Sequence, residues 1–284
     1  MVGIFLLDKQ SHWTSHDVVN KLKQRFHQRK IGHTGTLDPL ATGLLIVTLG
    51  GATKLMPYLN ELPKTYEAIL KLGEKTSSLD AETPVIARQF VPELDQKTIE
   101  TAMDSFLGEY RQTPPLTSAL KFEGEPLYRK AHRGEKVKVK SRIVIIEELI
   151  LQDYDAVNKR LKFSVTCSSG TYIRTLGADL AGQLGTIGYL QSLRRTAIGQ
   201  FHVDDAKRVD EVTPEDLLPI AKALYFIPLV PYDEKNAAAA LNGRAIKLQN
   251  LDHPRVLIPD CEGKIIAIYQ RVNHHLYRCL RGLR

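Results

Sequence analysis

Residues 32–45, GHTGTLDPLATGLL, join a glycine-rich loop to an apolar run and contain a single acidic residue, Asp38. The run continues as LLIVTLG at 44–50, which predicts a buried strand directly after the loop. Because Asp38 precedes Pro39, a capped turn of helix at 39–42 is one interpretation. A loop with exposed backbone amides around one carboxylate equally suits an acid held against a ligand, and the residues alone leave both open.

Hydrophobic periodicity predicts strands and helices on either side of this stretch. Apolar runs predict strands at 3–9, 44–50, 65–73, 142–152, 159–167 and 189–201. Helical spacing predicts helices at 16–26 with Ser15 as N-cap, and at 52–60, 97–107, 213–220 and after Gly170. Beyond 234 an alanine run and short apolar pieces between turns predict a small, mostly β appendage.

The composition predicts a globular protein with a basic surface. The chain has 284 residues, of which 43% are hydrophobic, and a formal net charge of +7. The length fits one large domain plus a small one, or two moderate ones. A basic chain suggests nucleic acid as the partner, although solubility alone explains such a charge about equally well.

Several classes of protein are excluded by motif. The three cysteines lack CxxC spacing, which favours a reduced compartment over a zinc site. No apolar run is long enough for a bilayer, and residues 1–10 lack the basic leader of a signal peptide. No metal-ligand spacing and no nucleophile-elbow motif occurs. We therefore expect a cytoplasmic protein without a membrane segment or a metal.

Two segments concentrate positive charge. Residues 113–141 are rich in proline, glycine and charge, which predicts an excursion from the core. From Lys121 to Arg142 the chain has eight Lys or Arg against three Glu, a local +5. Residues 255–284 hold six Lys or Arg and two acids, a local +4. Both segments are candidate contact surfaces for an anionic polymer.

Individual side chains suggest chemistry without deciding it. Arg174 lies in the first turn of the helix predicted after Gly170, where a cation opposes the helix dipole. It is either an ordinary surface ion pair or the partner of a carboxylate in a pocket. Tyr66 and Tyr172 are either core residues or platforms that stack on a base. His33 is more often a satisfied loop histidine than a catalyst.

Seven stretches together resemble the tRNA pseudouridine synthases of the TruB type, over most of residues 3–200. They are LLDKQSHWTSHDVV near the start, KIGHTGTLDPLATGLL at 30–45, KTYEA at 64–68, TSSLDAE at 76–82, PPLTSALKFEGEPLYRKAHRGE at 114–135, CSSGTYIRTLGADL at 167–180 and LRRT at 193–196. The second and sixth are highly specific in combination and order.

The resemblance implies a role for each matching residue. Asp38 falls on the catalytic aspartate, Tyr66 on the tyrosine that stacks on the target base, and Arg174 on the arginine that pairs with the acid. Further matching positions are Tyr172 beside the pocket, Leu193 as its apolar wall, His33 in the space left by the flipped nucleotide and Asp80 near the base. RNA-backbone contacts are expected at Lys9, Lys64, Arg129, Lys130 and Arg133.

The resemblance also implies the fold and its domains. It predicts an α+β pseudouridine synthase fold whose central sheet is mixed, largely antiparallel and flanked by helices. The catalytic domain is expected over 1–232, with 113–141 as an inserted loop that closes over RNA. Residues 233–284 are expected to form a small β-rich PUA-like domain that binds RNA.

The implied reaction is isomerisation of the uridine at position 55 in the T-loop of tRNA. The N1–C1′ glycosidic bond breaks and a C5–C1′ bond forms after the uridine has left its stack. Nothing is oxidised and no group is added, so no cofactor is expected. The expected partner is the tRNA T stem-loop, with no obligate protein partner, and the protein is expected to be a monomer.

Six positions depart from the family pattern, and three other functions compete with the first. The departures are Gln10, His12, Ser77, Thr83, His132 and Tyr189. The main alternative is an RNA-binding or tRNA-folding module with little or no catalysis. A guide-dependent relative would have a longer C-terminal domain than the roughly 50 residues after 234. A glycoside hydrolase would need two carboxylates at a defined separation.

Overall fold

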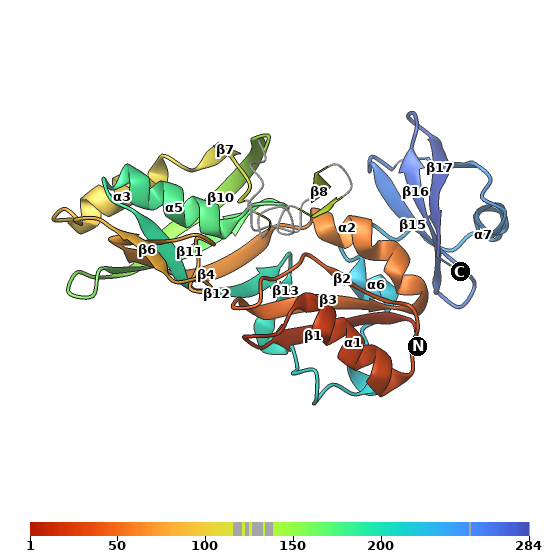
Figure 1. Cartoon of the computed structure of the whole chain (residues 1–284). Helices are drawn as coiled ribbons and strands as arrows, with labels where there is room; N and C mark the ends of the chain where they lie inside the picture. The colour runs from red at the N-terminus through yellow and green to blue at the C-terminus, as the bar shows by residue number, and fades with distance from the viewer. Residues whose placement is uncertain (116–120, 123–124, 127–132, 134–138, 250, 284) are drawn as a thin grey trace.

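The computed structural model describes residues 1–115, 121–122, 125–126, 133, 139–249 and 251–283. Within these residues the main sheet has nine strands, in the order β1-β3-β12-β4-β11-β10-β7, with β2 on β3 and β13 on β12 (Figure 1). Their bounds are β1 Gly3–Lys9, β2 Ile31–Thr34, β3 Thr42–Leu49, β4 Lys64–Leu72, β7 Gly108–Gln112, β10 Arg142–Asp155, β11 Arg160–Cys167, β12 Gly188–Ile198 and β13 Phe201–His202.

The sheet is mixed and largely antiparallel, as the sequence predicts. Among the described strands, β12 and β3 form the one parallel pair, in which Arg195 lies opposite Gly43. Gly43 has φ +100°, and a Cβ there would stand 2.2 Å from the Arg195 carbonyl oxygen. Only glycine lets these two backbones approach so closely.

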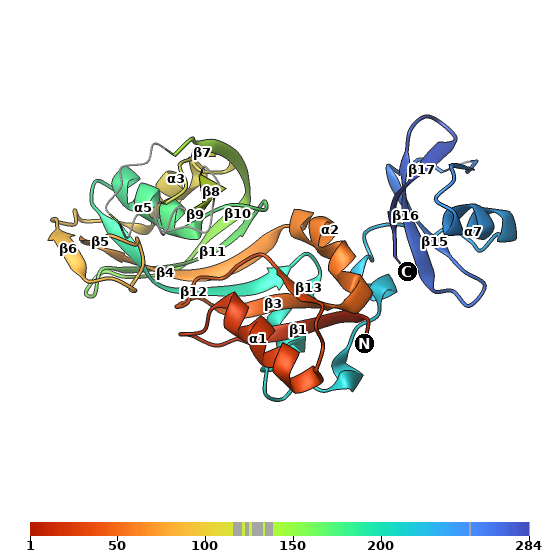
Figure 2. The same ribbon diagram turned by 45° about the vertical axis from the view of Figure 1, so that its right-hand side comes forward.

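Helices cover the sheet at several places (Figures 1 and 2). The described helices are α1 Ser15–Phe26, α2 Met56–Glu61, α3 Gln96–Asp104, α5 Ile173–Gln183, α6 Ile220–Ala223 and α7 Glu234–Leu241, of which α7 packs on the C-terminal strands instead. Helix α1 packs Val18 and Leu22 against Phe5 and Val47 of β1 and β3. Helices α3 and α5 bury their apolar sides on the other half of the sheet, where Leu176 is fully buried.

Short 3-10 segments and small sheets complete the described residues. The 3-10 segments are η1 Gly50–Leu55, η2 Val203–Asp205 and η3 Pro214–Asp216. The two-stranded sheets pair β5 Glu74–Thr76 with β6 Val85–Arg88, and β8 Lys121–Phe122 with β9 Glu125–Pro126. The part of the chain described contains no helix with the length and apolarity to cross a membrane.

The C-terminal residues form a separate antiparallel sheet, as the composition predicts. It has the order β14-β17-β16-β15, with bounds β14 Ile246–Lys247, β15 Arg255–Pro259, β16 Ile265–Arg271 and β17 Leu276–Gly282. One face packs on α7 around Tyr269 and Tyr277. Leu257, Ile268 and Leu283 instead join the core cluster of Leu55 and Leu59, so the small sheet rests on the body near α2 (Figure 2).

Two local predictions need correction, and one of the two interpretations of the Asp38 loop falls away. The N-cap of α1 is Thr14 rather than Ser15, because Thr14 and Asp17 form a reciprocal capping box. The helix predicted at 213–220 is reduced to η3 and α6, because Leu218 pairs with Ile4 as an edge of the sheet. No helical turn forms at 39–42, where the chain passes through a turn into β3.

Candidate active site

The loop between β2 and β3 holds Asp38 in place through contacts from outside the loop. The buried Ser15 hydroxyl accepts a hydrogen bond from the Leu37 amide at 2.9 Å. The Lys9 ammonium donates to the Pro39 carbonyl at 3.1 Å and to the Trp13 carbonyl at 2.6 Å. These contacts fix the backbone on both sides of Asp38, so its carboxylate has a defined position.

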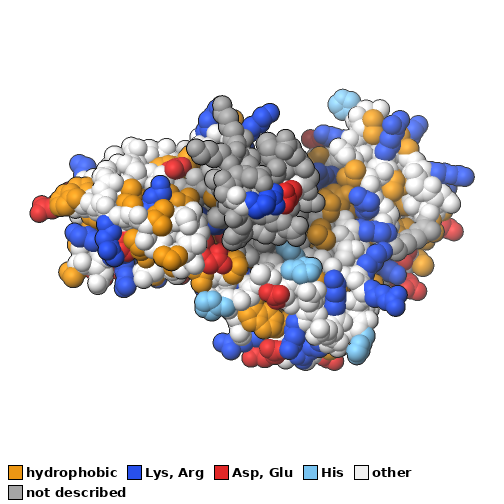
Figure 3. All heavy atoms as spheres, viewed as in Figure 1, with side chains coloured by type: hydrophobic (Ala, Val, Ile, Leu, Met, Phe, Trp, Pro, Cys, Tyr) orange, Lys and Arg blue, Asp and Glu red, His pale blue; other side chains and the backbone are white. Residues whose placement is uncertain are grey.

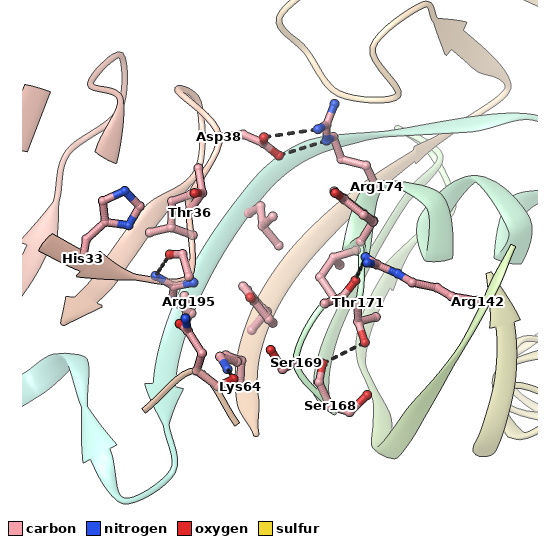
Figure 4. Close-up of a pocket in the computed structure, with 18 residues that line it drawn as sticks. His33, Thr36, Asp38, Lys64, Arg142, Ser168, Ser169, Thr171, Arg174 and Arg195 are labelled. Carbon is pink, nitrogen blue, oxygen red and sulfur yellow. Dashed lines mark hydrogen bonds and ion pairs between the residues drawn. The ribbon is translucent and has the colours of Figure 1, made fainter. Parts of the chain in front are cut away.

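Helix α5 brings Arg174 to this carboxylate. Arg174 is only 3% exposed, and its Nε and Nη2 lie 2.9 and 3.1 Å from the two carboxylate oxygens of Asp38 (Figure 4). Its Nη1 donates to the Ser78 carbonyl at 2.8 Å and lies 3.5 Å from Asp80 Oδ2. Of the two interpretations of Arg174, the geometry selects the partner of a carboxylate in a pocket. A bidentate pair of this kind also fixes the carboxylate's orientation.

Asp80 is a second carboxylate beside the same guanidinium, and unlike Asp38 it is buried. Its Oδ1 accepts from the Ser78 hydroxyl at 2.5 Å and from the Glu82 amide at 3.0 Å. Burial raises the pKa of Asp38, Arg174 opposes that rise, and the charge of Asp80 adds to it. The arrangement therefore sets the protonation of Asp38 by competition between burial and one shared cation.

A cleft of about 610 Å³ opens in front of Asp38 and Arg174. Tyr66 and Leu193, which project from β4 and β12, supply apolar wall, and His33 lies on the same side as Asp38 (Figure 4). Burial raises the pKa of the Tyr66 hydroxyl, so this ring stays neutral. The cleft thus combines an acid, a buried cation and an aromatic face.

Tyr172 is the N-cap residue of α5 and lines the same cleft. The guanidinium of Arg142 lies 4.9 Å from its ring centroid. Its backbone is clamped by Gln112, which donates to the Tyr172 carbonyl at 3.0 Å and accepts from its amide at 2.7 Å. The stacked guanidinium and the amide clamp together hold the ring at the cleft wall.

His33 is a neutral, half-buried side chain. Burial lowers its pKa, and the nearby cation Arg195 lowers it further. Its Nδ1 is buried and has no hydrogen-bond partner among the described residues. A neutral imidazole with an open ring nitrogen at the cleft wall is suited to hydrogen bonding rather than to carrying charge.

The residues expected to contact RNA backbone lie in different settings. Lys9 is buried, and its ammonium is used by the carbonyls around the Asp38 loop, so it does not reach the surface. Lys64 is also buried but lines the cleft. Arg133 is exposed and pairs with Glu125 at 2.7 Å. Arg129 and Lys130 lie outside the described residues, as does most of 113–141.

Sequence reasoning missed Arg195 as a cleft residue. Its neighbour Arg194 points to the other face of β12 and pairs with Asp8 at 2.8 Å. Arg195 points inward, is 1% exposed and lies 6.0 Å from the centroid of the Tyr66 ring. The alternation of side chains along a strand could have separated the two arginines, but only once the buried face of β12 was known.

The described residues contain no group of three or more His, Cys, Asp or Glu side chains placed to hold a metal ion. The polar atoms of the cleft are instead guanidinium, ammonium, hydroxyl and amide groups around one carboxylate. Such a lining recognises a polar, negatively charged ligand with a flat ring.

Comparison with known proteins places these features in a family. Residues 23–173 match the model of the TruB family pseudouridylate synthase N-terminal domain. The chain is 39% identical over 275 residues to tRNA pseudouridine synthase B of Thermobifida fusca, covering 94% of this chain and 93% of that protein. It is 34% identical to the Mycoplasma mycoides protein of the same name, covering 99% and 96%.

Solved structures show the same fold. A Cbf5-Nop10-Gar1 complex contains a chain that superposes with a TM-score of 0.75 at 23% identity, covering 99% of this chain and 85% of that one. A structure of an H/ACA RNP bound to a substrate RNA containing 2'-deoxyuridine gives a TM-score of 0.73 at 20% identity. At these identities the likeness concerns the arrangement of strands and helices.

Proposed function

This chain belongs to the TruB family of pseudouridylate synthases, and from that premise we propose that it isomerises the uridine at position 55 in the T-loop of tRNA. It is a tRNA pseudouridine synthase, and the T stem-loop is the part of tRNA that the cleft receives. The observation that carries the proposal is the bidentate pair of Asp38 and Arg174 at the wall of a cleft that also contains Tyr66.

The chemistry needs an acid next to the sugar–base junction. In the isomerisation the N1–C1′ bond breaks, the uracil turns, a C5–C1′ bond forms, and the C5 proton is lost while N1 gains one. Asp38 is the catalytic residue because it is the cleft carboxylate whose two oxygens are held in a fixed orientation. Arg174 favours the ionised form that burial disfavours.

The uridine must leave its stack to reach Asp38. Tyr66 offers its ring as a stacking platform, which recovers about 1–3 kcal/mol of the lost stacking. Leu193 and Tyr172 bound the base, His33 occupies the wall beside it, and Asp80 supports Arg174 from behind. The rearrangement moves atoms within one nucleotide, so we propose no cofactor.

We further propose a division at residue 232. Residues 1–232 form the catalytic domain, and 233–284 form a small PUA-like domain that binds RNA. The separate sheet of β14 to β17 supports this boundary, as does its own apolar cluster with α7. We propose that the protein is a cytoplasmic monomer without an obligate protein partner. The acid, the arginine and the tyrosine of the cleft all come from one chain, which supports a site that needs no second subunit.

The test compares wild type with Asp38→Asn on unmodified tRNA. Pseudouridine at position 55 is measured by chemical mapping, and tRNA binding is measured alongside. We expect the variant to bind tRNA like wild type and to lose at least about 10³-fold in turnover. Asp8→Asn is the matched control. Asp8 on β1 also pairs with an arginine, Arg194, but this arginine points to the face of β12 opposite Arg195.

Two results would contradict the proposal. Tight binding by wild type without any conversion would indicate a tRNA-folding module. Equal conversion by wild type and Asp38→Asn would place the catalytic group elsewhere.

A further inference from the structure

Two buried cations line the cleft, and no carboxylate of the described residues neutralises them. Lys64 on β4 is 5% exposed, and Arg195 on β12 is buried more deeply still. Within the described part of the chain, no carboxylate lies within ion-pair distance of either. Burying charge without a counter-charge is costly, so such a pair calls for a ligand of opposite charge.

Neither cation uses all its hydrogen-bond donors. The Lys64 ammonium donates to the carbonyls of Asn60 and Leu62, each at 2.6 Å, which leaves one N–H. Arg195 donates from Nε to the Leu44 carbonyl at 2.7 Å and from Nη2 to the Gly35 carbonyl at 2.9 Å. The Tyr66 hydroxyl is a further side-chain partner of Arg195, and the five N–H groups of the guanidinium outnumber these three acceptors. Free donors and unbalanced charge therefore occur together.

The two side chains converge on one point of the backbone. A Cβ on Gly35 would lie 3.2 Å from Arg195 Nη1 and 3.9 Å from Lys64 Cε. Burial lowers the pKa of Lys64 to about 8, and the charge of Arg195 is the next cause. Each cation thus disfavours the other, and an anion between them would relieve both costs.

On the side of the cleft with Asp38 and Arg174, negative charge exceeds positive charge. There one guanidinium faces two carboxylates, Asp38 and Asp80, so an added anion would be repelled. Figure 4 shows Lys64 and Arg195 on one side of the opening, with Ser168, Ser169 and Thr171 across from them. Hydroxyl groups and cations on facing walls are suited to a phosphate.

We propose that Lys64 and Arg195 form an anion subsite that binds one phosphodiester of the RNA beside the target uridine. The subsite itself follows from the two unbalanced cations; the identity of its anion rests on the proposed function. By anchoring the backbone next to the flipped nucleotide, it would fix the sugar relative to Asp38. This gives Arg195 and Lys64 a role in substrate positioning rather than in bond breaking.

The test neutralises single phosphates. T-arm RNA hairpins, each with one uncharged methylphosphonate linkage, are titrated against wild type and Lys64→Met. We expect one linkage near the target uridine to weaken wild-type binding about 5- to 10-fold. In Lys64→Met the same neutral linkage should weaken binding by less than about 2-fold, because the lysine that contacts this phosphate is already absent. The salt slope of binding should fall by about 1 in the variant.

Matched variants separate this role from packing. Lys71→Met removes an ammonium on the same strand that also donates to a backbone carbonyl, that of Asn158, but outside the cleft. It should keep the wild-type sensitivity to every linkage, and Lys64→Arg should restore it. If Lys64→Met fails to fold, Lys64→Gln carries the same test, because its amide still donates to the neighbouring carbonyls.

The outcomes are distinct from those of the proposed function. If each neutral linkage weakens RNA binding equally in wild type and in the Lys64 variant, the subsite is overturned even if pseudouridine forms. If wild type shows the linkage-specific loss but makes no pseudouridine, the subsite stands and the proposed reaction falls.

Discussion

The cleft and the C-terminal sheet use charged side chains in opposite ways. In the cleft Arg174, Arg195 and Lys64 are all buried, and their partners are carbonyls, a ring and one shared pair of carboxylates. On the C-terminal sheet Arg271 pairs with Asp252, whose side chain is 93% exposed. Figure 3 shows basic side chains spread over the surface of that sheet.

The difference shows which charged side chains lower the stability of the fold and are explained by function instead. An exposed ion pair gains little, because water already solvates both partners. A buried cation has lost its water and depends on fixed partners, so its removal or its neutralisation has large effects. Mutation of a charged residue should therefore have large effects in the cleft and small effects on the C-terminal sheet.

The comparison is tested most strongly by removing one guanidinium from each region. Arg174→Met leaves two carboxylates facing one another, so we expect a loss of about 3–5 kcal/mol in the free energy of unfolding and at least about 10²-fold in kcat. Arg271→Met should change the free energy of unfolding by less than about 1 kcal/mol and leave kcat unaltered. Urea unfolding and single-turnover kinetics measure both. Similar losses in the two variants would contradict the difference between buried and exposed cations.

Apolar packing, in contrast, should matter equally in the C-terminal sheet. Ile268 is fully buried in the cluster that β16 shares with α2. Ile268→Ala should lower the free energy of unfolding by about 2–5 kcal/mol, with kcat per folded molecule unchanged. Leu280→Ala, at an exposed position on β17, is the control and should shift unfolding by about 0.5 kcal/mol or less. A two-stage unfolding curve in Ile268→Ala would instead show that the sheet unfolds separately.

Burial of Lys64 should make the free energy of unfolding depend on pH. Its pKa of about 8 lies below the 10.5 of an unperturbed lysine, so the unfolded chain binds the proton more tightly than the folded one. Relative to Lys64→Met, wild type should gain stability as pH rises from 8 to 10.5, by up to about 3 kcal/mol. Denaturant unfolding of both proteins across that range measures the difference. A difference that stays constant with pH would mean that Lys64 is not desolvated.

The smallest expected effect concerns Asp80. Its charge raises the pKa of Asp38, so Asp80→Asn should lower that pKa. If turnover needs ionised Asp38, the acidic limb of the kcat profile should move to lower pH. Glu61→Gln, which alters an exposed pair with Arg255, should leave the limb in place. Movement to higher pH would show that Asp80 acts mainly by supporting Arg174.

Much of the fold could be predicted from the sequence because its main strands are long and apolar. The strand after the Asp38 loop and the helix that carries Arg174 lie where the pattern places them. The short strands β2, β5, β6 and β7 were not predicted, because few residues and mixed polarity give no clear period. The pairing of Leu218 with Ile4 depends on a sheet edge that local sequence cannot reveal.

The site was predictable in its residues and not in its electrostatics. The motif residues identified Asp38, Arg174 and Tyr66, and the structure brings them to one cleft. Lys9 and Lys64 were expected to contact the RNA backbone; both are buried, and of the two only Lys64 lines the cleft. Burial of a lysine follows from the register of its strand and from the carbonyls around it, which a single sequence does not show.

The central place of β12 has a consequence for synthesis on the ribosome. Strand β12 lies between β3 and β4 and is the only described strand that joins the two halves of the main sheet. Yet it is made after both neighbours, more than 100 residues later than β4. Until it emerges, the half that carries Asp38 and the half that carries Tyr66 have no strand pairing between them. A nascent chain shorter than about 200 residues therefore has no assembled catalytic centre, and its unpaired strand edges are a natural target for chaperones.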